Sequence, residues 1–135
     1  MHHRDEPHAE TALSLLKTIP LSILKTSGDC WKAQVRLAAL LLDLGRPKEA
    51  RSLAVAAATN AQESMLPAEE APARLQMARA DLMMGKLDSA QKAIDRVKAI
   101  HLGTPCTAQV SNAMDMYQEL ITLRGEREAE ASPLC

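Results

Sequence analysis

The 135-residue chain contains no phenylalanine and has a single tryptophan and a single tyrosine, Trp31 and Tyr117. Stacking platforms for nucleic-acid bases and cages for quaternary amines need aromatic rings, so both kinds of site are nearly excluded. Strand-forming residues are sparse, and no β-branched run alternates with polar residues. Leucine, alanine and methionine dominate the apolar residues, and all three favour helix. The composition therefore predicts an all-α protein.

Other kinds of sequence signal are also missing. The cysteines, Cys30, Cys106 and Cys135, are odd in number and widely spaced, and no CxxC motif indicates a zinc site. The net charge of -1 gives no general attraction to nucleic acid or anionic membranes. The apolar run from Leu37 to Leu42 is too short to span a bilayer, and the polar start lacks a secretory signal. We expect a cytoplasmic protein that binds no cofactor, nucleic acid or membrane.

Helical spacing of apolar residues, interrupted by glycine and proline, predicts six helices. A single helical domain is expected over residues 9–124, between a disordered start (1–8) and a flexible tail (125–135). Pro20 should end or kink the first helix, and Gly125 closes the last helix. Residues 62–71 form either a connector or a ragged helix start, with Pro67 and Pro72 as candidate first-turn prolines. The predicted helices are Ala9–Ile19, Cys30–Leu44, Pro47–Ala61, Pro72–Met84, Leu87–Ile100 and Thr104–Arg124.

Three glycines, Gly45, Gly85 and Gly125, are spaced forty residues apart and indicate an internal repeat. Around each of the first two glycines, a small residue lies seven positions before the glycine, another lies five positions after it, and a third lies seven positions further on. These residues are Ala38, Ala50 and Ala57 around Gly45, and Ala78, Ala90 and Val97 around Gly85. Together with Leu41 and Leu87, this pattern resembles the tetratricopeptide repeat over residues 31–61 and 71–101. Small side chains at these sites would let two helices approach closely.

The resemblance implies a fold of antiparallel helix pairs, stacked as a short right-handed superhelix of about six helices. A third complete unit is not expected, because Gln118 and Glu130 stand where small residues belong. The chain should hold a leading helix, two full pairs and a closing helix with a polar outer face, as terminal repeats need.

In this family, ligands lie along the concave surface made by the first helix of each pair. By position, the resemblance implies a partner-binding groove lined by Lys32, Val35, Arg36, Ala39, Leu42, Leu75, Arg79, Leu82 and Met83. With Asn112, Asp115 and Glu119 as its extension, this strip is apolar with a basic edge and suits an amphipathic helix or an extended peptide with acidic flanks. The alternative is that Leu42, Leu82 and Met83 belong to the core.

Catalytic and metal sites find little support. The "GRPKEA" stretch at Gly45 has a single glycine and follows a helix, whereas a phosphate-binding loop has two glycines and follows a strand. His2, His3 and His8 lie in a polar start. Carboxylates such as Asp43 and Asp81 have the spacing of solvated helix faces. An enzyme is therefore not expected.

The sequence predicts a non-enzymatic protein–protein interaction module, an adaptor or a chaperone. In length and repeat class it also resembles the cytoplasmic chaperones of type III secretion needle subunits. A third possibility is a small subunit or fragment of a larger assembly, with homo- or hetero-oligomers formed through the N-terminal helix. Clamping of a chaperone's C-terminal carboxylate is disfavoured, because Val35 and Ala39 replace the lysine and asparagine that this function needs.

Overall fold

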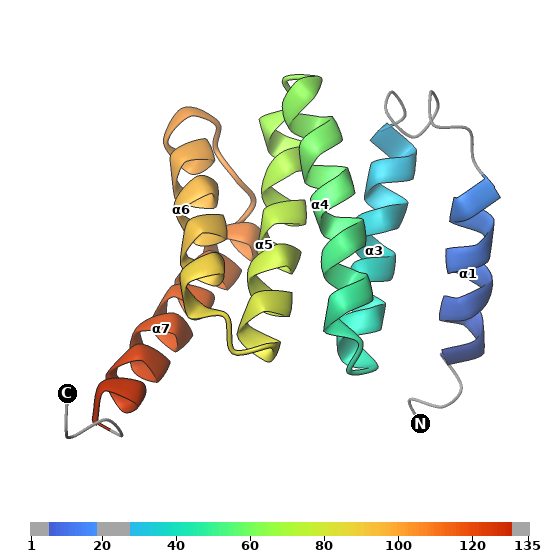
Figure 1. The fold of residues 1–135 in the computed structure, drawn as a ribbon. Helices are drawn as coiled ribbons and strands as arrows, with labels where there is room; N and C mark the ends of the chain where they lie inside the picture. Colours follow the sequence, from blue (N-terminus) through green and yellow to red (C-terminus); the bar gives the residue numbers. More distant parts are fainter. Residues whose placement is uncertain (1–5, 19–27, 131–135) are drawn as a thin grey trace.

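The computed structural model describes residues 6–18 and 28–130, and over these residues the protein is all-α, as predicted. The described chain forms six helices and no strand (Figure 1). They are α1 (Glu6–Thr18), α3 (Gly28–Asp43), α4 (Pro47–Glu63), α5 (Pro67–Met83), α6 (Leu87–Gly103) and α7 (Ala108–Glu130). The predicted kink at Pro20 lies outside the described residues.

The helices are stacked as antiparallel pairs in two layers (Figure 1). Consecutive helices from α3 to α7 pack side by side, and α3 and α7 also contact α5 directly. The helices α3, α5 and α7 therefore form one layer, which α4 and α6 cover. The leading helix α1 packs against α3 at one edge of the stack.

Three links of equal length join the helices from α3 to α6. In each link, the same two hydrogen bonds end the preceding helix. The backbone N–H groups of the second and third link residues donate to carbonyl oxygens in the last turn of that helix. The second residue of each link, Gly45, Met65 and Gly85, has a positive φ of 76°, 58° and 74°. Because α4 and α5 each have 17 residues and the links have equal length, the same turn recurs at positions 45, 65 and 85.

Of the two interpretations of residues 62–71, the connector is wrong, whereas the helix start is confirmed from Pro67 onward. Helix α4 continues to Glu63, and α5 begins at Pro67, with Pro72 inside it. Pro72 lies in the second turn of α5, where its ring removes one helical hydrogen bond, and the helix continues through it. The turn itself was missed because Met65 occupies the position that glycine occupies in the other two links.

The predicted ends of the last helix are also wrong. Helix α7 begins at Ala108, where Thr107 Oγ1 accepts a hydrogen bond from Val110 N–H (3.3 Å), as an N-cap does. It then passes through Gly125 to Glu130, so part of the expected tail is helical. At the other end α1 begins at Glu6, so residues 6–8 are not the disordered start that was expected.

The interior is built largely from alanine. More than half of the buried apolar residues are alanines, and the six small residues of the predicted repeat are all buried. The largest fully buried apolar side chains are Leu41, Ile94 and Val97. Small side chains at the helix contacts let neighbouring backbones approach closely, which supports the pairing of α3 with α4 and of α5 with α6.

Candidate functional site

The predicted groove residues fall into a surface set and a core set. Lys32, Arg36 and Met83 are exposed, and Val35, Ala39 and Arg79 are half-buried. In contrast, the side chains of three leucines are only 2–4% exposed and belong to the core: Leu42, Leu75 and Leu82.

The assignment of these three leucines to a binding surface is therefore wrong. Leu42 follows the buried Ala38 by four residues, and Leu82 follows the buried Ala78 by four. Residues four apart share one face of a helix, so these leucines extend the stripe that packs against neighbouring helices. Met83 is 45% exposed and stays at the surface.

A cavity of about 180 Å³ lies between α3 and α5, and we call it the α3–α5 cavity. It belongs to the layer of α3, α5 and α7, which we call the layer of first helices, and α4 and α6 are the second helices. Its walls are mostly apolar, with a Lys32–Glu69 ion pair at the rim (Nζ to Oε1, 4.0 Å). Lys32 remains 61% exposed. The residues that line it are Trp31, Lys32, Val35, Arg36, Ala68, Glu69 and Pro72.

A second cavity of about 120 Å³, the α5–α7 cavity, lies between the start of α5 and the start of α7. It is lined by Ala68, Ala71, Pro72, Pro105, Cys106, Thr107 and Val110. Ala68 and Pro72 line both cavities, so the first turns of α5 form a ridge between them. Sequence reasoning missed this ridge because it began the predicted helix at Pro72, whereas α5 begins at Pro67.

At the other end of the same layer, a polar contact replaces the cavities. Arg79 Nη2 on α5 donates to Asp43 Oδ1 on α3 at 2.6 Å, so Arg79 is not the free basic edge that was predicted. Tyr117 on α7 lies within their field: burial raises the pKa of its hydroxyl, while Arg79 lowers it and Asp43 raises it further. Farther along the predicted strip, three residues of α7 are exposed: Asn112, Asp115 and Glu119.

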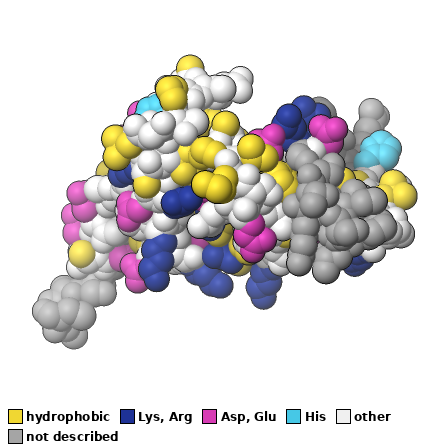
Figure 2. All heavy atoms as spheres, turned by 90° about the horizontal axis from the view of Figure 1, so that it is seen from above, with side chains coloured by type: hydrophobic (Ala, Val, Ile, Leu, Met, Phe, Trp, Pro, Cys, Tyr) yellow, Lys and Arg dark blue, Asp and Glu magenta, His cyan; other side chains and the backbone are white. Residues whose placement is uncertain are grey.

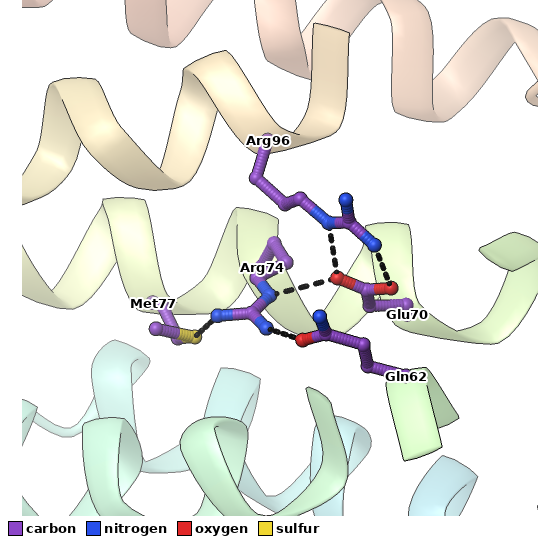
Figure 3. A network of polar contacts seen from close by, with 5 residues as sticks. All are labelled: Gln62, Glu70, Arg74, Met77 and Arg96. Carbon is purple, nitrogen blue, oxygen red and sulfur yellow. Dashed lines mark hydrogen bonds and ion pairs between the residues drawn. The ribbon is translucent and has the colours of Figure 1, made fainter. Parts of the chain in front are cut away.

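A buried carboxylate, Glu70, joins the second helices to α5 (Figure 3). Arg96 on α6 donates two hydrogen bonds to it, from Nε (2.7 Å) and Nη2 (2.9 Å), and Arg74 Nε donates a third (3.1 Å). Arg74 Nη2 also donates to Gln62 Oε1 on α4 at 2.7 Å. Burial would raise the pKa of Glu70, but the two guanidinium groups outweigh it and hold the pKa below its usual range.

A second buried carboxylate, Asp81, makes a similar connection near the opposite end of α5. Asp81 is fully buried and accepts hydrogen bonds from Arg51 Nε on α4 and Ser89 Oγ on α6, both at 2.7 Å. The prediction that Asp81 lies on a solvated face is therefore wrong. Asp81 joins α5 directly to α4 and α6, whereas Glu70 joins α5 to α6 through Arg96 and to α4 through Arg74 and Gln62.

Metal chemistry finds no geometric support in residues 6–18 and 28–130. Over that part of the chain, no group of three or more histidine, cysteine, aspartate or glutamate side chains is placed to hold a metal ion. His8 is exposed on α1, and His101 Nδ1 accepts a hydrogen bond from the Cys106 backbone N–H (3.4 Å). His2, His3 and Cys135 lie outside the described residues.

The fold and the site define a class: an all-α protein of stacked antiparallel helix pairs, whose layer of first helices carries two small apolar cavities. Comparison of the chain with protein-family models, with curated proteins and with solved structures gives no match. Among the described helices, none combines the length and the apolar character needed to cross a membrane.

Proposed function

We propose that the protein is a non-enzymatic interaction module of the tetratricopeptide-repeat type, an adaptor or chaperone that holds a segment of another protein. The segment would lie across α3, α5 and α7. The observation that carries the proposal is the pair of apolar cavities that share the walls of Ala68 and Pro72. Two neighbouring apolar cavities suit two side chains from one face of a helix, or alternate side chains of an extended peptide.

The charges beside the cavities favour a partner with acidic residues. Arg36 is exposed at the wall of the α3–α5 cavity, and Lys32 is also exposed although it contacts Glu69. A carboxylate on the partner could therefore contact Arg36 without breaking an ion pair between residues that the structure describes. The basic edge of the site is Arg36 with Lys32, because Asp43 already neutralises Arg79.

Narrower versions of this proposal concern the partner and its setting. A chaperone of secretion-needle subunits would cover an aggregation-prone helix in the cytoplasm, and an adaptor would connect two proteins. Isolation of the partner from an extract of the source cells would decide between them, because the partner's own sequence would show which kind it is.

Once a partner has been identified, two substitutions test whether it binds the α3–α5–α7 face. Ala68→Trp places a large ring on the ridge between the cavities, and Arg36→Glu reverses the free charge. Since both sites are exposed, we expect helicity and melting temperature to be preserved. Each variant should bind the partner at least about tenfold more weakly, because the first blocks the cavities and the second opposes acidic residues.

The matched controls are Ala99→Trp and Lys92→Glu, which make the same changes at exposed positions of α6, away from both cavities. Affinities would be measured by isothermal titration calorimetry. If all four variants bind like the parent protein, the partner does not use the α3–α5–α7 face and the proposed site is wrong.

A further inference from the structure

The two cavities lie side by side in one layer, and their spacing limits the conformation of a segment that fills both. They are lined by the first three turns of α3, the first two turns of α5 and the start of α7. Figure 2 looks onto the end of the stack at which α3 and α5 begin and shows hydrophobic side chains gathered over its middle. Because Ala68 and Pro72 form the wall between the cavities, a segment that leaves one cavity must cross α5 to enter the other.

The distance between the cavities follows from the packing of the helices. The helices α3, α5 and α7 are neighbours within one layer, and the axes of packed helices lie about 8–10 Å apart. Each cavity lies between two of these axes, so a similar distance of about 8–10 Å separates the cavity centres.

Of the regular peptide conformations, polyproline II has the spacing that fits. Its side chains return to the same face every third residue, which is about 9.3 Å along the segment. Two residues of a β-strand cover only about 6.6–6.8 Å. An α-helix repeats a face after about 6 Å, which is four residues, or about 10.5 Å, which is seven. A segment in the polyproline II conformation therefore places one side chain in each cavity without distortion.

The ridge between the cavities also suits this conformation. Ala68 and Pro72 carry no polar side-chain atoms, so they offer no hydrogen bonds to a backbone that crosses them. A polyproline II segment needs none, because its backbone groups remain solvated. A β-strand, in contrast, gains its affinity from main-chain hydrogen bonds to the protein that binds it.

The two cavities differ in size and therefore select different side chains. An apolar cavity of about 150 Å³ can hold a benzene ring. The α3–α5 cavity, at about 180 Å³, thus accepts leucine or an aromatic ring, whereas the α5–α7 cavity, at about 120 Å³, accepts a smaller residue such as valine or proline.

The charges beside the α3–α5 cavity favour one acidic residue next to the larger side chain. Arg36 is exposed at the cavity wall and has no ion pair with a described residue, whereas Lys32 and Glu69 face each other at 4.0 Å. Asp29 is also exposed without an ion pair among the described residues, but it precedes Arg36 by seven residues, about 10.5 Å along α3. The unpaired charge at the cavity wall is therefore positive.

We propose that the partner segment binds in the polyproline II conformation, with a large apolar residue in the α3–α5 cavity and a valine or proline three residues away in the α5–α7 cavity. An acidic residue flanks the large residue on the side away from the smaller one and contacts Arg36. This inference rests on the proposed function, because it concerns the partner of the same face. It adds the backbone conformation, the spacing of the apolar residues and the place of the charge.

The experiment uses synthetic peptides in a proline-rich host, which keeps them in the polyproline II conformation. In the test peptide, glutamate precedes leucine and valine follows leucine by three residues. A second test peptide has the reverse order, because the spacing is the same in both chain directions. Two control peptides of the same composition place valine two or four residues from leucine, and a helical peptide places them seven residues apart.

Affinities would be measured by nuclear magnetic resonance titration of the full chain, in which the indole N–H of Trp31, the single tryptophan, reports from the cavity wall. We expect one test peptide to bind with a dissociation constant of about 1 mM or less, at least about tenfold more tightly than both spacing controls. Ala68→Trp should abolish this binding, and Ala99→Trp on α6 should preserve it.

The position of the charge has a test of its own. Replacement of the peptide glutamate by glutamine should weaken binding to the parent protein about threefold, as expected for an exposed ion pair. The same replacement should have no effect on binding to Arg36→Gln. Lys92→Gln, at an exposed position of α6, is the matched control and should respond like the parent.

Equal affinities for all spacings would overturn the inference, as would tighter binding of the helical peptide or no binding at about 5 mM peptide. The proposed function is decided separately, by the binding of the natural partner to Ala68→Trp and Arg36→Glu. If these variants lose the partner while the peptides show no preference for the spacing of three, the partner uses the face in another conformation, and only the inference fails. If they bind the partner like the parent, the proposed function fails.

Discussion

At the scale of single residues, Glu70 is the clearest case of a side chain that determines how helices are held together. Its carboxylate is only 1% exposed and accepts hydrogen bonds from Arg96 and Arg74 (Figure 3). A buried ion pair gains little net stability over apolar residues, but removal of one partner leaves the other charge buried without compensation. Glu70 is therefore a sensitive point in an interior that otherwise depends on small apolar residues.

We predict that Glu70→Gln lowers the free energy of unfolding by about 2 kcal/mol at pH 7, since the charged acceptor of two guanidinium groups is lost. The pKa of Glu70 is held below its usual range in the folded protein. Its contribution to stability is therefore fully present above the unfolded pKa of about 4.3 and is lost as the pH falls through the folded pKa. Urea unfolding at a series of pH values should show the parent and the variant converging in acid.

Glu119→Gln serves as the control, because Glu119 is exposed on α7, and we expect it to change the stability little. A stability difference for Glu70→Gln that stays constant down to about pH 3, well below the ordinary glutamate pKa, would show that shape rather than charge is responsible.

The sequence identified the small residues of the core better than its charged ones. Ala38 and Ala78 were recognisable because their spacing to the turn glycines repeats. Glu70 and Asp81 look like ordinary surface carboxylates until their partners are known, and Arg51 and Arg96 are distant in the chain. One signal was present: Asp81 follows Ala78 by three residues and thus falls on the buried stripe of α5.

At the scale of helices and turns, the glycines of the forty-residue spacing have two different functions. Gly45 and Gly85 adopt the left-handed conformation that ends a helix, whereas Gly125 lies inside α7. A Cβ added at Gly45 or at Gly125 would meet no atom within 4 Å, so the backbone alone decides the effect of a substitution.

We predict that one change, glycine to alanine, has opposite effects at these two positions. Gly45→Ala should destabilise the protein by about 1 kcal/mol, because alanine strains a turn with φ 76°. Gly125→Ala should stabilise it by roughly 0.5–1 kcal/mol, because alanine favours a helix interior. Chemical denaturation of the two variants beside the parent provides the measurement, and effects of the same sign would contradict the assigned conformations.

The sequence predicted the elements where glycine marked their ends and missed them where another residue took that place. The turn at Met65 carries the same backbone bonds as the turns at Gly45 and Gly85, but methionine gives no sign of a left-handed residue. The forty-residue spacing seen in the sequence is therefore twice the spacing of the turns in the structure.

At the scale of the whole molecule, α5 is the centre of the stack. It packs against α3, α4, α6 and α7, and both buried carboxylates project from it. Helix α1 packs against α3 and is further tied by an ion pair from Glu10 to Arg46, in the link after α3. This arrangement implies that the stack is held most firmly at its middle and least firmly at the α1 edge.

Hydrogen–deuterium exchange monitored by mass spectrometry should reveal this gradient. Amides of α1 should exchange at least about a hundredfold faster than those of α5, because few buried contacts must break to free α1. Peptides from α4 and α6 should exchange about as slowly as those of α5, since the Glu70 and Asp81 networks join all three helices. Equal protection of α1 and α5 would show instead that the molecule opens as one unit.

The sequence was sufficient for the all-α class and the stacking of pairs, but it could not establish which part of a first helix faces solvent. Leu42 and Leu82 were assigned to a surface that their neighbours in fact cover. The ridge at Ala68 and Pro72 appeared only once α5 was known to begin at Pro67. Exposure depends on the packing of helices far apart in the chain, which periodicity within one helix does not encode.

The alanine-rich interior determines which kinds of mutation the protein tolerates. In a core of large side chains, most damage comes from truncation, which leaves cavities. Here Ala54, Ala58 and Ala73 are completely buried and have almost nothing to lose, whereas any larger residue at these sites must push two helices apart. Substitutions of these alanines by glycine therefore change the helix spacing little, whereas substitutions by larger residues disturb it. Substitutions should accumulate mainly on the outer faces, including the surface proposed here for binding.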